Sequence, residues 1–170
     1  MKANVRGSEL AEKRVLGVDP GLSATGYAVV AGAGQRFSVL EAGTIRTRPG
    51  TPLPERLGLI HDALVQAIAT FDPRAVAVEE VFLGRNAPSA MATAEVIGIV
   101  KLLARGRDLR TYPPRQVKKW ICGNGSAPKE QMISMVASLI TGGRLPVDRW
   151  SDHAADAVAI ALCAFFEGDR

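Results

Sequence analysis

Residues 14–21 read RVLGVDPG, a short apolar run that stops at an Asp-Pro-Gly turn. Such a run, bounded by turn residues, is typical of a strand buried in a sheet. Further strands are predicted at 25–32 (TGYAVVAG) and 37–47 (FSVLEAGTIRT), and AGAGQ at 31–35 predicts the hairpin turn between them. The first strand therefore opens a sheet and carries a carboxylate, Asp19, at its end.

Strands and helices alternate in the rest of the chain. Apolar residues at helical spacing, with prolines or glycines at the ends, predict helices at 51–71, 88–105, 127–140 and 150–162. Apolar runs predict two more strands, at 74–82 and 109–114. Antiparallel strands followed by strand–helix alternation favour an α/β fold, in which helices flank a mixed five-stranded sheet.

Length and composition fit one domain. The chain has 170 residues, of which 47% are hydrophobic and 22% charged, so it can bury a substantial core. Residues 1–14 are polar and lack an apolar run, which predicts a flexible N-terminal tail. The single folded domain is expected at 15–168.

No stretch approaches the roughly 20 apolar residues of a membrane span, and the start does not resemble a signal peptide. Cys122 and Cys163 lie far apart and show no metal-ligand spacing, which favours free thiols in a reducing cytoplasm. The net charge of +4 is compatible with nucleic acid as a partner, but it is insufficient evidence by itself.

Several acidic residues stand where an apolar segment begins or ends. Asp19 and Glu79 end predicted strands, and Asp152, His153 and Asp156 open the last helix. At about 100° per residue, Asp156 lies roughly 40° around the helix from Asp152 and 60° from His153. Carboxylates gathered at one place repel one another, and a hard divalent cation such as Mg²⁺ or Mn²⁺ relieves that repulsion. One or two such ions suit phosphodiester hydrolysis.

Each of these residues also has a structural interpretation. The alternatives are a turn residue for Asp19, a solvated strand end for Glu79 or Glu80, a cap or first-turn acid for Asp152, and a structural histidine for His153. Asp156 is the hardest to explain structurally, because it is surrounded in sequence by Ala, Val and Ile.

Basic residues gather in the third quarter of the chain. The run PRQVKKW at 114–120 contains Arg115, Lys118 and Lys119, a pattern that is more often a solvated face. Lys129 follows Pro128 in the first turn of a predicted helix, where the helix dipole disfavours a cation. A nearby phosphate or carboxylate would offset that cost.

Four stretches in this order closely resemble the RuvC family of Holliday junction resolvases, which has a ribonuclease H-like fold. They are VLGVDPGLSATGYAVV (15–30), VAVEEVFLGRNAPSA (76–90), YPPRQVKKWICGNGSAPKEQM (112–132) and DHAADAVAIAL (152–162). The resemblance implies a crossover junction endodeoxyribonuclease of recombination and repair. Such an enzyme cuts four-way DNA junctions by symmetric paired nicks that leave 5′-phosphates and 3′-hydroxyls.

The resemblance also implies roles for individual residues. One or two Mg²⁺ or Mn²⁺ ions would be held by Asp19, Glu79 (rather than Glu80), His153 and Asp156. Lys118 and Lys129 would act near the scissile phosphate. Phe82 would contact bases at the junction centre, with core packing as its alternative, and Arg115 and Lys119 would bind DNA. The family also implies a homodimer and a RuvA–RuvB branch-migration complex as partner.

This chain departs from the family pattern at two positions. His153 stands where an aspartate is common, as in a histidine-containing subset of the family, and imidazole suits Mn²⁺ better than Mg²⁺. The alternatives are that His153 is an acid–base group, or that Asp152 supplies the carboxylate. Ile97 stands where an arginine is common, so the helix at 88–105 is apolar on most sides. This favours burial in a dimer, with core burial in the single chain as the alternative.

Three other functions compete with the resolvase. A catalytically inactive junction-binding protein would keep the fold and bind without cutting. A ribonuclease H-type nuclease would act on RNA–DNA hybrids. DPGLSATG at 19–26 also resembles the phosphate loop of actin-like sugar kinases, but those chains are far longer and repeat the fold twice.

Overall fold

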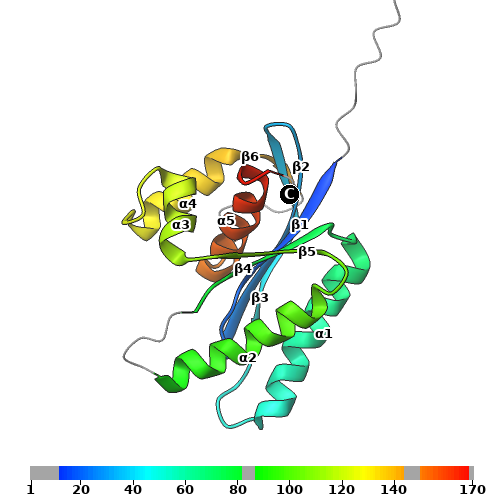
Figure 1. Cartoon of the computed structure of the whole chain (residues 1–170). Helices are drawn as coiled ribbons and strands as arrows, with labels where there is room; N and C mark the ends of the chain where they lie inside the picture. The colour runs from blue at the N-terminus through cyan, green and yellow to red at the C-terminus, as the bar shows by residue number, and fades with distance from the viewer. Residues whose placement is uncertain (1–11, 82–86, 144–149, 169–170) are drawn as a thin grey trace, which may run out of the picture.

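The computed structural model describes residues 12–81, 87–143 and 150–168. It contains a twisted sheet with helices on both faces (Figure 1). The strands are β1 (Lys13–Asp19), β2 (Ala24–Ala33), β3 (Arg36–Arg46), β4 (Ala75–Glu79), β5 (Asp108–Tyr112) and β6 (Ile140–Gly143). The helices are α1 (Leu53–Phe71), α2 (Ala87–Leu103), α3 (Pro114–Cys122), α4 (Lys129–Leu139) and α5 (Asp152–Phe166).

The strand order in the sheet is β5-β4-β1-β2-β3-β6. β1 pairs in parallel with β4, β4 with β5 and β3 with β6, whereas β2 is antiparallel to both of its neighbours. β1, β4 and β5 therefore all have their carboxyl ends at one edge of the sheet. In open α/β sheets that edge is the usual place for a ligand.

The alternation of side chains along β1 divides the core into two layers. Val15 belongs to the layer beneath α3, α4 and α5, whereas Leu16 and Val18 belong to the layer beneath α1 and α2. β4 follows the same rule, because Ala75 and Ala77 face α5 while its valines face the other way. Both strands are covered on both faces, which explains their nearly continuous apolar sequences.

α5 lies unusually close to the sheet. A Cβ atom on Gly17 of β1 would collide with the backbone of Ala157 and with Ala161, and one on Gly26 of β2 would collide with the backbone of His153. Only glycine allows this approach. The two glycines therefore set the depth of α5 over β1 and β2.

Polar contacts hold the far end of α5. The buried Arg110 of β5 forms ion pairs with Asp108 (2.6 Å) and Glu167 (3.1 Å), and it donates a hydrogen bond to the carbonyl of Gly168 (2.7 Å). Tyr112 donates to Glu167 at 2.7 Å. These contacts attach the end of α5 to β5.

The predicted α/β fold with a mixed sheet is confirmed, with one more strand than the five predicted. The additional strand, β6, has the sequence ITGG and pairs with the edge of β3. Helix α3 lies in the basic run for which no helix was predicted; Val117 and Ile121 are its buried residues, and Pro113 and Pro114 start it. The predicted tail at 1–14 falls almost entirely outside the described residues. Within the described part of the chain, no helix has the length and apolar character needed to cross a bilayer.

Replacing Gly17 with alanine is expected to destabilise the protein, because the new methyl group displaces the backbone of α5. Overpacking of this kind costs about 1–3 kcal/mol. The free energy of unfolding, measured by urea denaturation, reports the loss.

Gly58 of α1 is the matched control, because a Cβ there meets no atom within 4 Å. Gly58→Ala is expected to raise stability by roughly 0.5–1 kcal/mol, as alanine does in a helix interior. Equal urea midpoints for Gly17→Ala and the unmodified protein would contradict the close approach of α5.

Candidate active site

Asp19 and Glu79 end adjacent parallel strands at the same level of the sheet. The β1–β4 register pairs Val18 with Val78, so the next residue on each strand is an acid. By alternation, Asp19 follows Val15 and Gly17 onto the α5 face, and Glu79 follows Ala75 and Ala77 onto it. Between Glu79 and Glu80, the geometry therefore favours Glu79 as the residue that faces α5.

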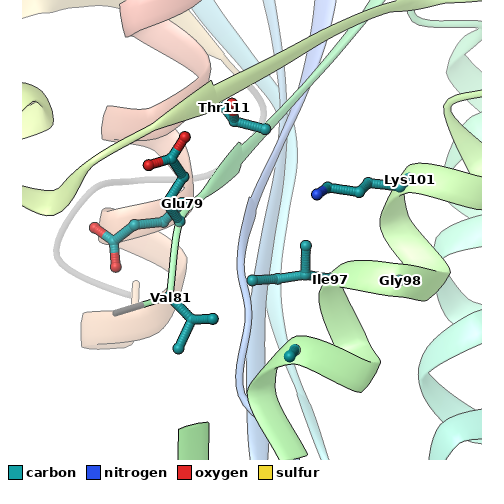
Figure 2. Close-up of a pocket in the computed structure, with 8 residues that line it drawn as sticks. Glu79, Val81, Ile97, Gly98, Lys101 and Thr111 are labelled. Carbon is teal, nitrogen blue, oxygen red and sulfur yellow. The ribbon is translucent and has the colours of Figure 1, made fainter. Parts of the chain in front are cut away.

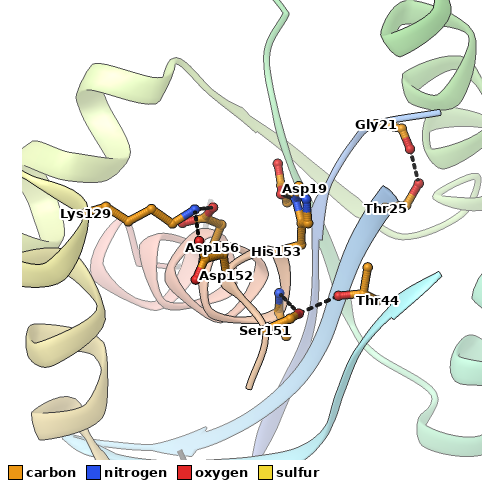
Figure 3. Close-up of polar contacts among 10 residues, drawn as sticks. Asp19, Gly21, Thr25, Thr44, Lys129, Ser151, Asp152, His153 and Asp156 are labelled. Atoms are coloured by element: carbon orange, nitrogen blue, oxygen red, sulfur yellow. Dashed lines mark hydrogen bonds and ion pairs between the residues drawn. The ribbon is translucent and has the colours of Figure 1, made fainter. Parts of the chain in front are cut away.

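The head of α5 brings the other site residues to these strand ends. Ser151 caps the helix by accepting a hydrogen bond from the backbone N–H of Ala154 (3.2 Å), and its hydroxyl also contacts Thr44 of β3. Asp152 is thus the first-turn acid of α5, and Ser151 supplies the cap. The Thr44 contact ties the first turn to the sheet (Figure 3).

His153 reaches directly to Asp19. Its Nδ1 lies 2.8 Å from Oδ2 of Asp19, and Figure 3 shows the two side chains meeting between α5 and β1. Asp19 is largely buried, with 16% of its side chain exposed, whereas His153 is 41% exposed. The imidazole therefore holds the carboxylate while remaining open to a ligand.

Lys129 lies on the other side of the helix head. Its Nζ is 3.0 Å from Oδ2 of Asp156 and 3.4 Å from Oδ2 of Asp152. Two carboxylates therefore lie beside this first-turn lysine, where the sequence predicted a phosphate or a carboxylate. Asp152 contacts Lys129 and is 67% exposed, so it lies with Lys129 and not with Asp19.

Burial and neighbouring negative charge raise the pKa of two of the acidic groups, Glu79 and Asp19. Burial, followed by the charges of Asp19 and Asp156, raises the pKa of Glu79 to about 7, while Lys118 and Lys129 oppose the increase. Burial also raises the pKa of Asp19, with a further contribution from Asp156 and an opposing hydrogen bond from His153. The site therefore has a shortage of positive charge at neutral pH.

A divalent cation would supply that charge, and the donor types present fit one. Carboxylate oxygens suit Mg²⁺ and Mn²⁺, and the imidazole adds a ligand that suits Mn²⁺. Across the described residues, however, no three His, Cys, Asp or Glu side chains already converge in a ligand geometry. Asp19 is turned to His153 and Asp156 to Lys129, so metal binding requires these side chains to exchange partners.

The predicted basic residues of 114–120 lie on α3. Arg115 and Lys119 are exposed, Lys118 is half-buried and close enough to act on the charge of Glu79, and Val117 and Ile121 are buried. The spacing of the three cations places them along one side of a helix. Phe82 lies outside the described residues.

A pocket of ≈ 320 Å³ lies between the end of β4 and helix α2. Glu79, Glu80, Ile97 and Lys101 are among its lining residues, and Figure 2 shows the Lys101 side chain extending from α2 toward β4. Ile97 is 8% exposed, so this position adds to the core. The cationic side chain that α2 contributes to this pocket is Lys101, which lies one helical turn after Ile97.

Sequence reasoning missed three residues that shape the site: Ser151, Thr44 and Lys101. Ser151 could have been found, because a serine before a helical run is a common N-cap. No local pattern in the sequence places Thr44 opposite Ser151, or Lys101 near Glu79, since both relations depend on tertiary packing.

The chain was compared with known proteins. A family model described as "Crossover junction endodeoxyribonuclease RuvC" matches residues 15–164. Proteins of that name from Thermomicrobium roseum and Pelotomaculum thermopropionicum are 42% and 39% identical to this chain. The alignment with the first protein covers 89% of this chain and 92% of that protein. The alignment with the second covers 88% of this chain and 90% of that protein.

Solved structures give the same result. The structure of "T. thermophilus RuvC in complex with Holliday junction substrate" superimposes with a TM-score of 0.83 and 36% sequence identity. The match covers 91% of this chain and 94% of that one. The fowlpox virus resolvase in complex with Holliday junction DNA has a TM-score of 0.60 at 13% identity, with 91% and 99% covered, and shares the fold.

Stability without metal is expected to fall as the pH rises toward 7. The folded state holds a proton on Glu79 up to a pKa of about 7, whereas an unfolded glutamate loses it near 4.5. The unfolded state is therefore favoured increasingly across this window. Glu79→Gln removes the titration and is expected to be more stable than the unmodified protein at pH 7.5 by about 1–3 kcal/mol.

Urea unfolding in a chelator at pH 5 and pH 7.5 measures this difference, with the exposed Glu95→Gln as control. A residual pH dependence from Asp19 is expected in Glu79→Gln. Identical pH profiles for Glu79→Gln and the unmodified protein would contradict the raised pKa.

Proposed function

The chain belongs to the RuvC family of crossover junction endodeoxyribonucleases, and on this premise we propose that it resolves four-way DNA junctions by paired nicks. Full-length similarity to proteins of this name supports the activity. The observation that carries the proposal is the meeting of Asp19, Glu79, His153 and Asp156, from three separate elements, at one edge of the sheet. A DNA substrate also supports a cytoplasmic place of action.

We propose that these four residues hold one or two divalent cations. Nucleases of this family depend on divalent metal, and the raised pKa values of Glu79 and Asp19 support a cation beside these carboxylates. When bound, the cation supplies the charge that activates water and stabilises the leaving oxygen. The preference for Mn²⁺ over Mg²⁺ follows from the imidazole of His153.

The cationic side chains would position the phosphate. Lys129 is aligned by Asp156 and Asp152, so its ammonium stands at the rim of the acidic cluster. With Asp156 serving as a metal ligand, Lys129 would be available to bind a phosphate oxygen and to offset developing negative charge. Lys118 would act in the same way from α3, with Arg115 and Lys119 contacting DNA farther from the cleavage point.

His153 has two candidate roles that its geometry supports. As a ligand, it would share a cation with Asp19, to which it is already hydrogen-bonded. As an acid–base group, it would exchange a proton with water, with Asp19 orienting its ring. The third possibility, that Asp152 supplies the missing carboxylate, has less support, because Asp152 is exposed and contacts Lys129.

We also propose that two copies associate through α2. Val96, Ile97 and Val100 of this helix are buried in the core, but Met91 and Leu102 are 64% and 66% exposed. A second copy would cover these side chains, and two-fold symmetry would match two equivalent strands in a junction. A RuvA–RuvB complex as a further partner stays a prediction from the family.

Cleavage of a synthetic four-way junction tests the proposed activity, with a linear duplex and an RNA–DNA hybrid as alternative substrates. Symmetric nicks in the junction alone are expected. Asp156→Asn is expected to slow them by about 10²–10³-fold, because a charged ligand is lost where charge develops. Asp62→Asn, at an exposed position of α1, is the control. Binding without nicks in Mg²⁺ and in Mn²⁺ would leave a junction-binding protein.

His153→Asp distinguishes the roles of the histidine in the same assay. If His153 is a ligand, the ratio of the rate in Mn²⁺ to the rate in Mg²⁺ is expected to fall in this variant. An unchanged ratio with an altered pH profile would assign His153 to proton transfer instead.

Leu102→Glu tests the association through α2. The unmodified protein is expected to have about twice the mass of the 18.0 kDa chain in light scattering. A buried charge at the interface should shift it toward the single chain. Met135→Glu, on the exposed side of α4, is expected to leave the mass unchanged. A single-chain mass for the unmodified protein at micromolar concentration would contradict the dimer.

A further inference from the structure

A second pocket, of ≈ 390 Å³, opens beside His153. It is lined by loop residues 21–24, by Arg56 of α1, by Thr93 of α2 and by His153 itself. Figure 3 shows Gly21 and Thr25 on the side of His153 opposite Lys129. This pocket therefore lies next to the acidic cluster, on the side of His153 away from Lys129. Its volume is in the range of small-ligand sites.

Hydroxyl groups fix the guanidinium of Arg56 in this pocket. Its Nε donates to Oγ1 of Thr47 at 2.8 Å, and its Nη2 donates to Oγ of Ser23 at 3.1 Å. Thr47 is 6% exposed and donates in turn to the carbonyl of Leu22 at 2.6 Å. Arg56 is thus oriented by Ser23, in the loop that follows Asp19, and by Thr47, which is itself hydrogen-bonded to that loop.

The charge of Arg56 is not neutralised by a carboxylate among the described residues. Arg14, Arg107 and Arg110 each form an ion pair with an acidic side chain, whereas both side-chain partners of Arg56 are neutral hydroxyls. A planar guanidinium with its full charge available is well suited to a phosphate. Among the residues that line this pocket, none is a cysteine or an acid.

We propose that Arg56, oriented by Thr47 and Ser23, binds a backbone phosphate next to the one that is cleaved. This inference rests on the proposed nuclease function. A DNA strand that is cut beside Asp19 must continue out of the active site over the surface next to it. The loop 21–24 joins the end of β1 directly to this pocket, so a bound phosphate would fix the strand relative to Asp19. Arg56 is then a positioning residue.

Salt dependence distinguishes phosphate binding from a purely structural role. Each phosphate neutralised by a protein cation contributes about 0.9 to the slope of log K against log salt for duplex DNA. A residue that only supports the loop would lower affinity or rate without changing that slope. The slope therefore reports the contact itself.

The experiment measures binding of a four-way junction, in a chelator, over a series of monovalent salt concentrations. Arg56→Gln is expected to reduce the slope by about 0.9 for each Arg56 engaged, and Arg56→Lys is expected to keep it. Arg36→Gln, which removes an exposed arginine at the β2–β3 turn, is the matched control and should also keep the slope. In cleavage, Arg56→Gln should raise KM more than it lowers kcat.

An unchanged slope for Arg56→Gln, in a protein whose thermal unfolding shows an intact fold, overturns the inference. If Arg56→Gln does not fold, Arg56→Met, which keeps more of the apolar stem, takes its place. Junction cleavage by the unmodified protein, together with an unchanged slope in the variant, overturns this inference and leaves the proposed function intact. Absence of both binding and cleavage in the unmodified protein overturns both.

Discussion

The contact of α5 with the sheet determines the geometry of everything around it. Gly17 and Gly26 present no side chain to the helix, so its backbone lies directly on β1 and β2. At this depth the side chains of the first two turns of α5 reach the carboxyl ends of β1 and β4. A helix held one methyl group farther away would separate His153 from Asp19, which now lie 2.8 Å apart. The polar contacts at both ends of α5 then set its position along the sheet.

The electrostatics of the site follow from that approach. Four ionisable groups from three elements are brought into a partly buried space, where burial and neighbouring charge raise the pKa of Glu79 and of Asp19. The protein stabilises the arrangement with two partners, His153 for Asp19 and Lys129 for Asp156. Both partners are chemically suited to later tasks, one toward a cation or water and the other toward phosphate. The groups that stabilise the acidic cluster are thus the groups proposed to act in catalysis.

Local sequence patterns predicted much of this fold. The buried strands, the hairpin and four of the helices have clear apolar patterns, and the acids that end two of the strands, Asp19 and Glu79, were visible beside them. The resemblance of four motifs to a family selected Glu79 over Glu80, and the alternation along β4 supports the same choice.

Other features of the fold could not be predicted from local sequence patterns, for physical reasons. α3 begins with two prolines and has only two buried residues, so its pattern is that of a loop. β6 contains two glycines and exists because the edge of β3 offers a partner. The position of Arg56 depends on Thr47 and Ser23, which are 9 and 33 residues away in the chain. Contacts of that kind are decided by packing and leave no periodic signal.

The order in which the site residues occur along the chain has a consequence for biosynthesis. Asp19 is near the beginning, Glu79 near the middle, and His153 and Asp156 lie in the last helix. A nascent chain that still holds α5 inside the ribosome lacks half of the proposed ligand set and the helix that covers the sheet. On the proposed ligand set, the complete site can therefore form only once α5 has left the ribosome and packed on the sheet.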